Sequence, residues 1–164
     1  MYVVVRSGTT WTQQQKLVAN DGAANDLFGS HIALDGDTAF IGAWYDDDNG
    51  ENSGSVYVFV RSGTTWTQQQ KLVATDGAAR DYFGGSNFGF PVALDGKTAV
   101  IGALADDDNG DWSGSVYVFV HPCDASSAPT NGGVGDCTSS LAHGGTCQPT
   151  CCLLYTSPSP RDRG

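Results

Sequence analysis

The chain repeats itself, and an internal repeat limits the possible folds more than any other feature of a sequence. Residues 5–19 read VRSGTTWTQQQKLVA, and residues 60–74 read the same. The segment SGSVYVFV occurs at residues 53–60 and again at 113–120. The first pair is displaced by 55 residues and the second by 60, and the doubled Phe-Gly of FGGSNFG places the five extra residues within 83–89. The chain is therefore expected to build similar units in series.

Each complete unit contains four candidate strands separated by turn residues. Asp-Gly and Asn-Gly between short apolar runs indicate hairpins, so the strands should pair in order and antiparallel. The third candidate is apolar on both faces, which predicts that both faces are covered, while the fourth, rich in Gln and Thr, suits an outer position. We expect Tyr57 and Phe59 to be buried, and Tyr117 and Phe119 as well if a further unit covers them. The candidates are residues 32–34, 38–43, 54–60 and 65–73.

The predicted fold class is all-β, with antiparallel four-stranded blades that form an incomplete β-propeller, since a propeller needs about four to eight such blades. Two strands precede the complete unit and three follow it, so residues 1–120 are expected to hold about two blades. The chain starts inside a strand pattern, as a fragment would, and further blades are expected to be missing from it. Trp11 and Trp66 recur once per unit, and we expect them to pack against a neighbouring blade rather than bind sugars.

The repeated unit resembles the FG-GAP repeat, the blade of integrin alpha-subunit propellers, and is most similar to a divergent microbial and algal class. The resemblance covers about residues 2–120 and implies a non-catalytic, extracellular or cell-surface module for binding or adhesion. It also implies a protein or carbohydrate ligand at the propeller surface. The Phe-Gly pairs assigned to the family pattern are Phe28-Gly29 and Phe88-Gly89, and the Gly-Ala pairs are Gly42-Ala43 and Gly102-Ala103.

The calcium loop that integrin-type repeats often carry does not transfer to this sequence, because residues 34–38 and 94–98 form only short Asp-Gly turns. An acidic loop, DDDNG, instead follows each Gly-Ala pair, at residues 46–50 and 106–110. Calcium wants six to eight oxygen ligands, more than one such loop supplies. Carboxylates about 4 Å apart in water repel by only about 1 kcal/mol, so no metal is needed to hold them. The sequence favours a solvated turn, with weak calcium binding as the alternative. The candidate metal ligands are Asp46, Asp48, Glu51, Asp106, Asp108 and Asp111.

The composition changes after residue 120. Residues 121–152 carry every cysteine of the chain and resemble a small cysteine-rich extracellular repeat. Disulfides are favoured over zinc, because the two-residue spacing of zinc sites is absent, and an odd count leaves one thiol unpaired. Residues 153–164 resemble translated sequencing-adapter DNA or a disordered tail, and we expect them to be non-native. The disulfide candidates are Cys123, Cys137, Cys147, Cys151 and Cys152.

Charge and motif content exclude several function classes. The net charge is −10, which disfavours nucleic acid and anionic lipid as partners. No apolar run reaches the roughly 20 residues of a membrane span, and no signal peptide is visible. Neither a nucleophilic triad nor a phosphate-binding loop is recognisable, so the chain is not expected to be an enzyme. Two alternatives stay open: the accessory propeller domain of a secreted enzyme whose catalytic domain lies outside this fragment, and a structural surface protein.

Overall fold

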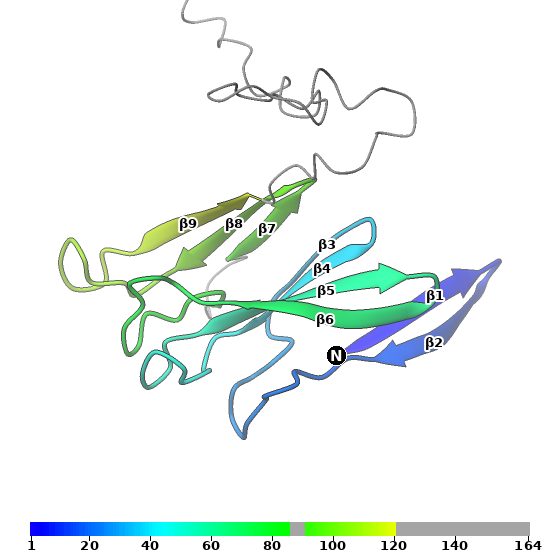
Figure 1. The fold of residues 1–164 in the computed structure, drawn as a ribbon, viewed down its shortest axis with the longest axis horizontal. Helices are drawn as coiled ribbons and strands as arrows, with labels where there is room; N and C mark the ends of the chain where they lie inside the picture. The colour runs from blue at the N-terminus through cyan, green and yellow to red at the C-terminus, as the bar shows by residue number, and fades with distance from the viewer. Residues whose placement is uncertain (86–90, 121–164) are drawn as a thin grey trace, which may run out of the picture. The chain divides into compact units, whose positions relative to one another are not determined.

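The computed structural model describes residues 1–85 and 91–120, which belong to one compact unit, Met1–Val120. These residues form nine strands in three antiparallel sheets and contain no helix, so the all-β prediction is confirmed (Figure 1). The sheet orders are β1-β2, β3-β4-β5-β6 and β7-β8-β9. The bounds are β1 Tyr2–Ser7, β2 Thr10–Lys16, β3 Ile32–Asp35, β4 Thr38–Ala43, β5 Ser55–Ser62, β6 Thr65–Leu72, β7 Val92–Asp95, β8 Thr98–Ala103 and β9 Ser115–Val120.

Tight glycine turns join the inner strands of each sheet. Asp35 pairs with Thr38 across the β3–β4 turn, and Gly36 within it has a φ of +55°. The β7–β8 turn repeats this geometry with Gly96 at +57°. The two central residues are Gly36-Asp37 and Gly96-Lys97, and glycine with positive φ at the first central position is typical of a type II′ hairpin turn.

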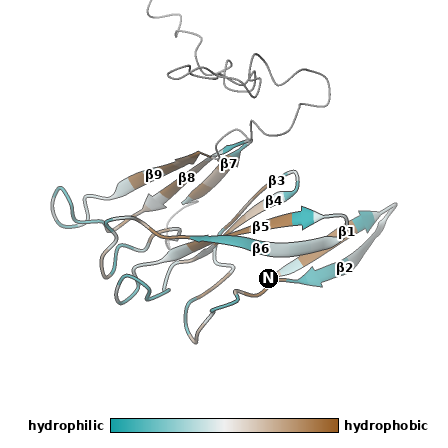
Figure 2. Ribbon diagram, in the orientation of Figure 1, coloured by the Kyte–Doolittle hydropathy of each residue, from teal (hydrophilic) through white to brown (hydrophobic). Residues whose placement is uncertain are grey.

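The third strand of the complete sheet is covered on both faces, as predicted. Val56 and Val58 pack in one buried cluster with Phe40 and residues of β7 and β8. Tyr57 and Phe59 point the other way, into a second cluster that includes residues of the first sheet, and they are 0% and 3% exposed. The alternation follows from the two-residue period of a strand. The middle sheet therefore packs between its two neighbours. Within it, β5 consists mostly of hydrophobic residues, whereas β6 is largely hydrophilic (Figure 2).

The last described strand is covered on one face only. Tyr117 and Phe119 are half-buried and pack against the cluster shared with the middle sheet. Val116, Val118 and Val120 point away from it and are 61–67% exposed. No strand among residues 1–85 and 91–120 covers this outer face.

The Phe-Gly pair of the second copy is not where the sequence assigned it. Phe28 packs on Tyr57 and Phe59, with ring centroids 5.3 and 6.0 Å apart. Phe83 makes the matching contacts in the second copy, at 5.4 Å from Tyr117 and 6.0 Å from Phe119. Phe83 is fully buried. The assignment of Phe88 was therefore wrong: Phe83 has the structural role, and Phe88-Gly89 lies outside the described residues.

The backbone around Phe83 confirms this correction. Gly84 N donates to Gly102 O at 3.0 Å, as Gly29 N donates to Gly42 O at 2.9 Å. Gly84 has a φ of +76°, and a Cβ there would lie 2.2 Å from Val56 Cγ2. Only glycine fits such a close approach, so this position requires the pair's glycine. The extra residues of the second copy consequently follow the Phe-Gly pair.

The two repeated tryptophans have different environments. Trp66 is 5% exposed and packs in the cluster between the first two sheets. Its backbone exchanges two hydrogen bonds with the Gln15 side chain of β2, both at 2.8 Å. The prediction of packing against a neighbouring blade is confirmed for Trp66. Trp11 at the equivalent position is 62% exposed, and the described residues contain no sheet before β1 on which it could pack as Trp66 does on β2, so the prediction for Trp11 is not tested.

Candidate functional site

The acidic loop of the first copy joins β4 to β5 and is built from tight turns. Gly50 N donates to Asp47 O at 3.0 Å, and Gly54 N donates to Asp46 O at 2.9 Å. The side chain of Asp47 accepts the Asn52 amide at 2.7 Å. Carboxylates that accept nearby backbone amides are a common way to stabilise a turn. The predicted turn is therefore present.

Asp46 is buried, which the sequence did not indicate. It is 3% exposed, and its Oδ1 accepts the Ser55 hydroxyl at 2.9 Å and the Asp48 amide at 3.2 Å. Its Oδ2 accepts the Tyr57 hydroxyl at 2.9 Å. The prediction of a solvated turn was wrong for Asp46, because the loop folds back onto β5. It holds for Asp47 and Asp48, which are exposed.

A lysine from β6 completes the site. Lys71 Nζ lies 2.9 Å from Asp21 Oδ2, 2.9 Å from Asp46 Oδ2 and 2.6 Å from Asp48 Oδ2. The ammonium also lies 5.2 Å from the centroid of the Tyr57 ring. Lys71, Asp21, Asp46, Asp48 and Tyr57 are named the lysine cluster below. It ties two strands and two loops into one charged network.

The charges of the lysine cluster stabilise one another. Burial alone lowers the pKa of Lys71, but hydrogen bonds to Asp48, Asp46 and Asp21 outweigh it and raise that pKa above its usual range. Burial, together with Asp46, raises the pKa of Tyr57. Burial opposes ionisation of Asp21, yet Lys71 lowers its pKa. The lysine is therefore cationic and the tyrosine neutral at ordinary pH, as the hydrogen bonds require.

The second copy contains the same carboxylates around Tyr117. Asp106 is 3% exposed, and its Oδ1 accepts the Asp108 amide at 3.2 Å, as Asp46 does from Asp48. The Tyr117 hydroxyl lies 3.0 Å from Asp106 Oδ2 and 2.8 Å from Asp76 Oδ1. Asp76, Asp106, Asp108 and Tyr117 are named the second cluster below. No lysine or arginine ion pair to it occurs among the described residues.

Two of the predicted metal ligands lie apart from these clusters. Glu51 pairs with Arg80 at 2.9 Å, and both side chains are about two-thirds exposed. Asp111 lies on the exposed part of its loop. Residues 1–85 and 91–120 contain no group of three or more His, Cys, Asp or Glu side chains placed to hold a metal. An ammonium occupies the space between the carboxylates of the first loop, so that donor set does not fit calcium while Lys71 is in place. Calcium binding itself stays a prediction.

Sequence reasoning missed Lys71 and Asp21. Both belong to repeated segments, since Lys16 and Asp76 stand at the corresponding positions of the other copy. The recurrence of a lysine and an aspartate at the same positions of each repeat was the sequence signal that could have identified them as site residues. The predicted disulfide residues, in contrast, lie outside the described part of the chain: Cys123, Cys137, Cys147, Cys151 and Cys152.

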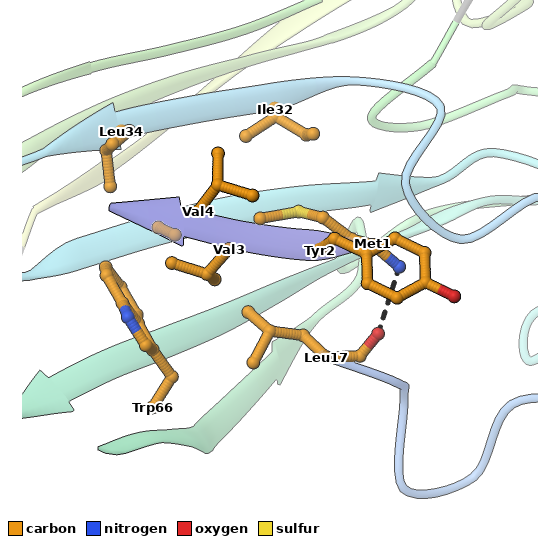
Figure 3. Close-up of a pocket in the computed structure, with 9 residues that line it drawn as sticks. Met1, Tyr2, Val3, Val4, Leu17, Ile32, Leu34 and Trp66 are labelled. Atoms are coloured by element: carbon orange, nitrogen blue, oxygen red, sulfur yellow. Dashed lines mark hydrogen bonds between the residues drawn. The ribbon is translucent and has the colours of Figure 1, made fainter. Parts of the chain in front are cut away.

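An apolar pocket lies beside β1 and β3 and has a volume of about 200 Å³. Tyr2, Val4, Ile32 and Leu34 line it together with Trp66, and Figure 3 shows their side chains around β1. The chain's amino group donates to the Leu17 carbonyl at 3.0 Å at one side of this pocket. Its lining side chains are apolar or aromatic, so it offers mainly apolar contact.

A family model described as FG-GAP repeat matches residues 11–59 and 66–119, which is more than half of the chain. No curated protein matches it. The two matched segments begin in β2 and in β6, the last strands of the first and second sheets, and end in β5 and in β9, the third strands of the second and third sheets. The lysine cluster is consequently shared between two successive repeats, since Lys71 belongs to the second match and its partners to the first. The described residues contain no helix long and apolar enough to cross a membrane.

Proposed function

Since the chain belongs to the FG-GAP repeat family, we propose that it is part of a non-catalytic extracellular module for binding or adhesion. Repeats of this family form propeller-type binding modules, and the stacked antiparallel sheets agree with that architecture. Within residues 1–85 and 91–120, His31 is the only histidine, and its Nδ1 is buried without a hydrogen-bond partner in the described part of the chain. No Ser-His-Asp arrangement is available there for nucleophilic catalysis.

The observation that supports a binding role most directly is the way each acidic loop is held. Buried Asp46 and Lys71 fix the backbone, so the exposed carboxylates of Asp47 and Glu51 are presented on an ordered loop. The second copy presents Asp107 and Asp111 on a loop with the same backbone turns around buried Asp106, but without an ion pair from a lysine among the described residues. Arg80 pairs with Glu51, but the loop stays predominantly acidic, and a rigid acidic surface attracts and orients a partner of opposite charge. We propose a protein ligand with a basic surface.

A carbohydrate is the second candidate ligand, and one feature of the first copy favours it. Trp44 stacks on Tyr45 with ring centroids 4.5 Å apart, and Tyr82 lies 5.5 and 5.9 Å from these two rings. Both tyrosines are half-buried. Flat aromatic groups with polar tips are common in binding surfaces.

The proposal is tested with the chain immobilised and exposed to an array of extracellular proteins and glycans. Variants with Asp47→Asn and Glu51→Gln remove exposed charge but keep the lysine cluster. Asp95→Asn, in the β7–β8 turn at the other end of β8 from the acidic loop, is the matched control. We expect binding of basic proteins that weakens about tenfold in the loop variant and with added salt, but not in the control. Equal affinity of the unchanged chain and the loop variant for basic proteins, or no binding at all, would contradict the proposal.

The extracellular assignment has its own test. Thiols are counted in secreted material under denaturing, non-reducing conditions. Disulfide formation in an oxidising compartment predicts about one free thiol for the odd cysteine count. Five free thiols would contradict it. The residues concerned are Cys123, Cys137, Cys147, Cys151 and Cys152.

A further inference from the structure

The two acidic loops contain the same Asn-Gly pair in the same local sequence, which makes an internal comparison possible. Each loop reads DDDNG, at residues 46–50 and 106–110. In each, the glycine amide donates to the carbonyl of the residue three positions earlier, at 3.0 and 2.9 Å. The asparagine amide of each loop donates to a serine hydroxyl, at 3.1 and 3.2 Å. The two asparagines, Asn49 and Asn109, are both exposed, so any difference between them arises from their contacts.

An asparagine followed by glycine is chemically reactive. The backbone nitrogen of the glycine can attack the side-chain carbonyl carbon of the asparagine, because no Cβ hinders the approach of that nitrogen. A bond forms between this nitrogen and Cγ, the bond from Cγ to Nδ2 breaks, and ammonia leaves with the proton of the glycine N–H. Water then opens the resulting cyclic imide at either carbonyl, and the product is aspartate or isoaspartate. The reaction consumes only water and needs no enzyme or cofactor.

The next repeat holds the asparagine of the first loop in place. Asn49 Nδ2 donates to the Ala74 carbonyl at 3.1 Å. Three backbone amides within residues 80–83 donate to the carbonyls of residues 51–53, at 2.7–3.2 Å. Gly50 is packed as well, since a Cβ built there would lie 3.1–3.2 Å from atoms of the next repeat. These contacts oppose the change in backbone conformation that the attack requires.

The asparagine of the second loop has no such contacts in the part of the chain that the structure describes. No hydrogen bond from Asn109 Nδ2, and no backbone amide that donates to the carbonyls of residues 111–113, occurs among the described residues. Gly110 is exposed, and a Cβ built there would have no neighbour within 4 Å. The loop is anchored at Asp106 of the second cluster, while its outer turn has few contacts. This turn therefore opens with fewer broken hydrogen bonds than the turn of the first loop.

We propose that Asn109 is a site of spontaneous deamidation and that contacts with the next repeat protect Asn49 from the same reaction. The product adds a carboxylate next to Asp107 and Asp108, in a loop that is already acidic. Isoaspartate also routes the main chain through the former side chain and lengthens it, which alters the turn that Gly110 closes. The modification is irreversible and changes one acidic loop but not the other. This inference does not depend on the proposed binding role.

The test follows the purified full chain over time in buffer at neutral pH, with Asn49 as the matched internal control. Samples are digested with trypsin and chymotrypsin, which place the two asparagines in separate peptides. Mass spectrometry with aspartyl and isoaspartyl reference peptides then measures conversion at each position. A further Asn-Gly pair, Asn131-Gly132, lies outside the described residues and is quantified separately. We expect Asn109 to convert at least about tenfold faster than Asn49, because several additional hydrogen bonds must break before attack in the first loop.

Unfolding the chain separates the effect of the fold from that of the local sequence. In concentrated urea, Asn49 and Asn109 should convert at rates within about twofold of each other, because both then lie in unfolded DDDNG segments. A difference that persists in urea would overturn the proposal, since the local sequence would then cause it. Equal rates in the folded chain, or faster conversion of Asn49, would also overturn it. The same holds if Asn109 of the folded chain stays unconverted while the urea sample converts.

Discussion

Replacement of Lys71 by methionine measures how much the lysine cluster contributes to stability. The substitution leaves Asp46, whose side chain is 5% exposed, without its counterion. Removal of one partner of a buried ion pair costs about 3–5 kcal/mol. Asp21 and Asp48 are 50% and 53% exposed, so water replaces the ammonium there at a cost of about 1 kcal/mol or less. We therefore expect a loss near the lower end, about 3 kcal/mol, which corresponds to a fall in Tm on the order of 10 °C.

The measurement is urea denaturation, followed by the fluorescence of the buried Trp66 and by circular dichroism. Lys16→Met is the matched control, because Lys16 occupies the same position of the repeat but is exposed, with its ammonium 5.8 Å from the Tyr2 ring. An exposed contact of this kind contributes about 0.5–1 kcal/mol. Addition of Asp46→Asn to Lys71→Met should restore part of the loss, since it removes the unpaired charge. A loss below about 1 kcal/mol for Lys71→Met, or equal losses for both lysines, would refute the reasoning.

Three further predictions concern the same core and loops. Phe59→Ala should cost about 3–5 kcal/mol in urea denaturation, and a loss below about 1 kcal/mol would show that β5 is not packed on both faces. Burial raises the pKa of Tyr57, and the carboxylates raise that of Lys71 more than its burial lowers it, so both groups hold protons more tightly in the folded state. Stability should therefore be constant at neutral pH and fall as pH rises above about 10, and a Tm that stays constant up to about pH 12 would contradict this. In a calorimetric titration, millimolar calcium should give no heat from binding at the first acidic loop, because the Lys71 ammonium lies between the carboxylates of that loop. Calcium binding tighter than about 100 μM that is abolished by Asp46→Asn with Asp48→Asn would establish a metal site there.

Much of the local structure was predictable because its signals lie within a few residues of one another. The Asp-Gly turns, the period-two pattern of β5 and the polar character of β6 place the strands to within about two residues of the observed bounds. The burial of Tyr57 and Phe59 follows from apolar side chains on both faces of one strand. Asp46 and Asp48 were identified as a pair because they stand two residues apart in a repeated loop.

The candidate site depended on contacts that only the packed sheets create. Lys71 contacts Asp21 and Asp46, which lie 50 and 25 residues before it in the chain, and no local sequence pattern pairs these residues. The stacking of the first sheet on the second and the register of β6 on β5 bring the three side chains together. The same packing places Phe83 against Tyr117, with ring centroids 5.4 Å apart, whereas the doubled Phe-Gly pair in the sequence left open which phenylalanine makes this contact. Sequence periodicity determines which face of a strand is apolar, whereas the position of each sheet on its neighbour decides which charges are buried and which partners they find.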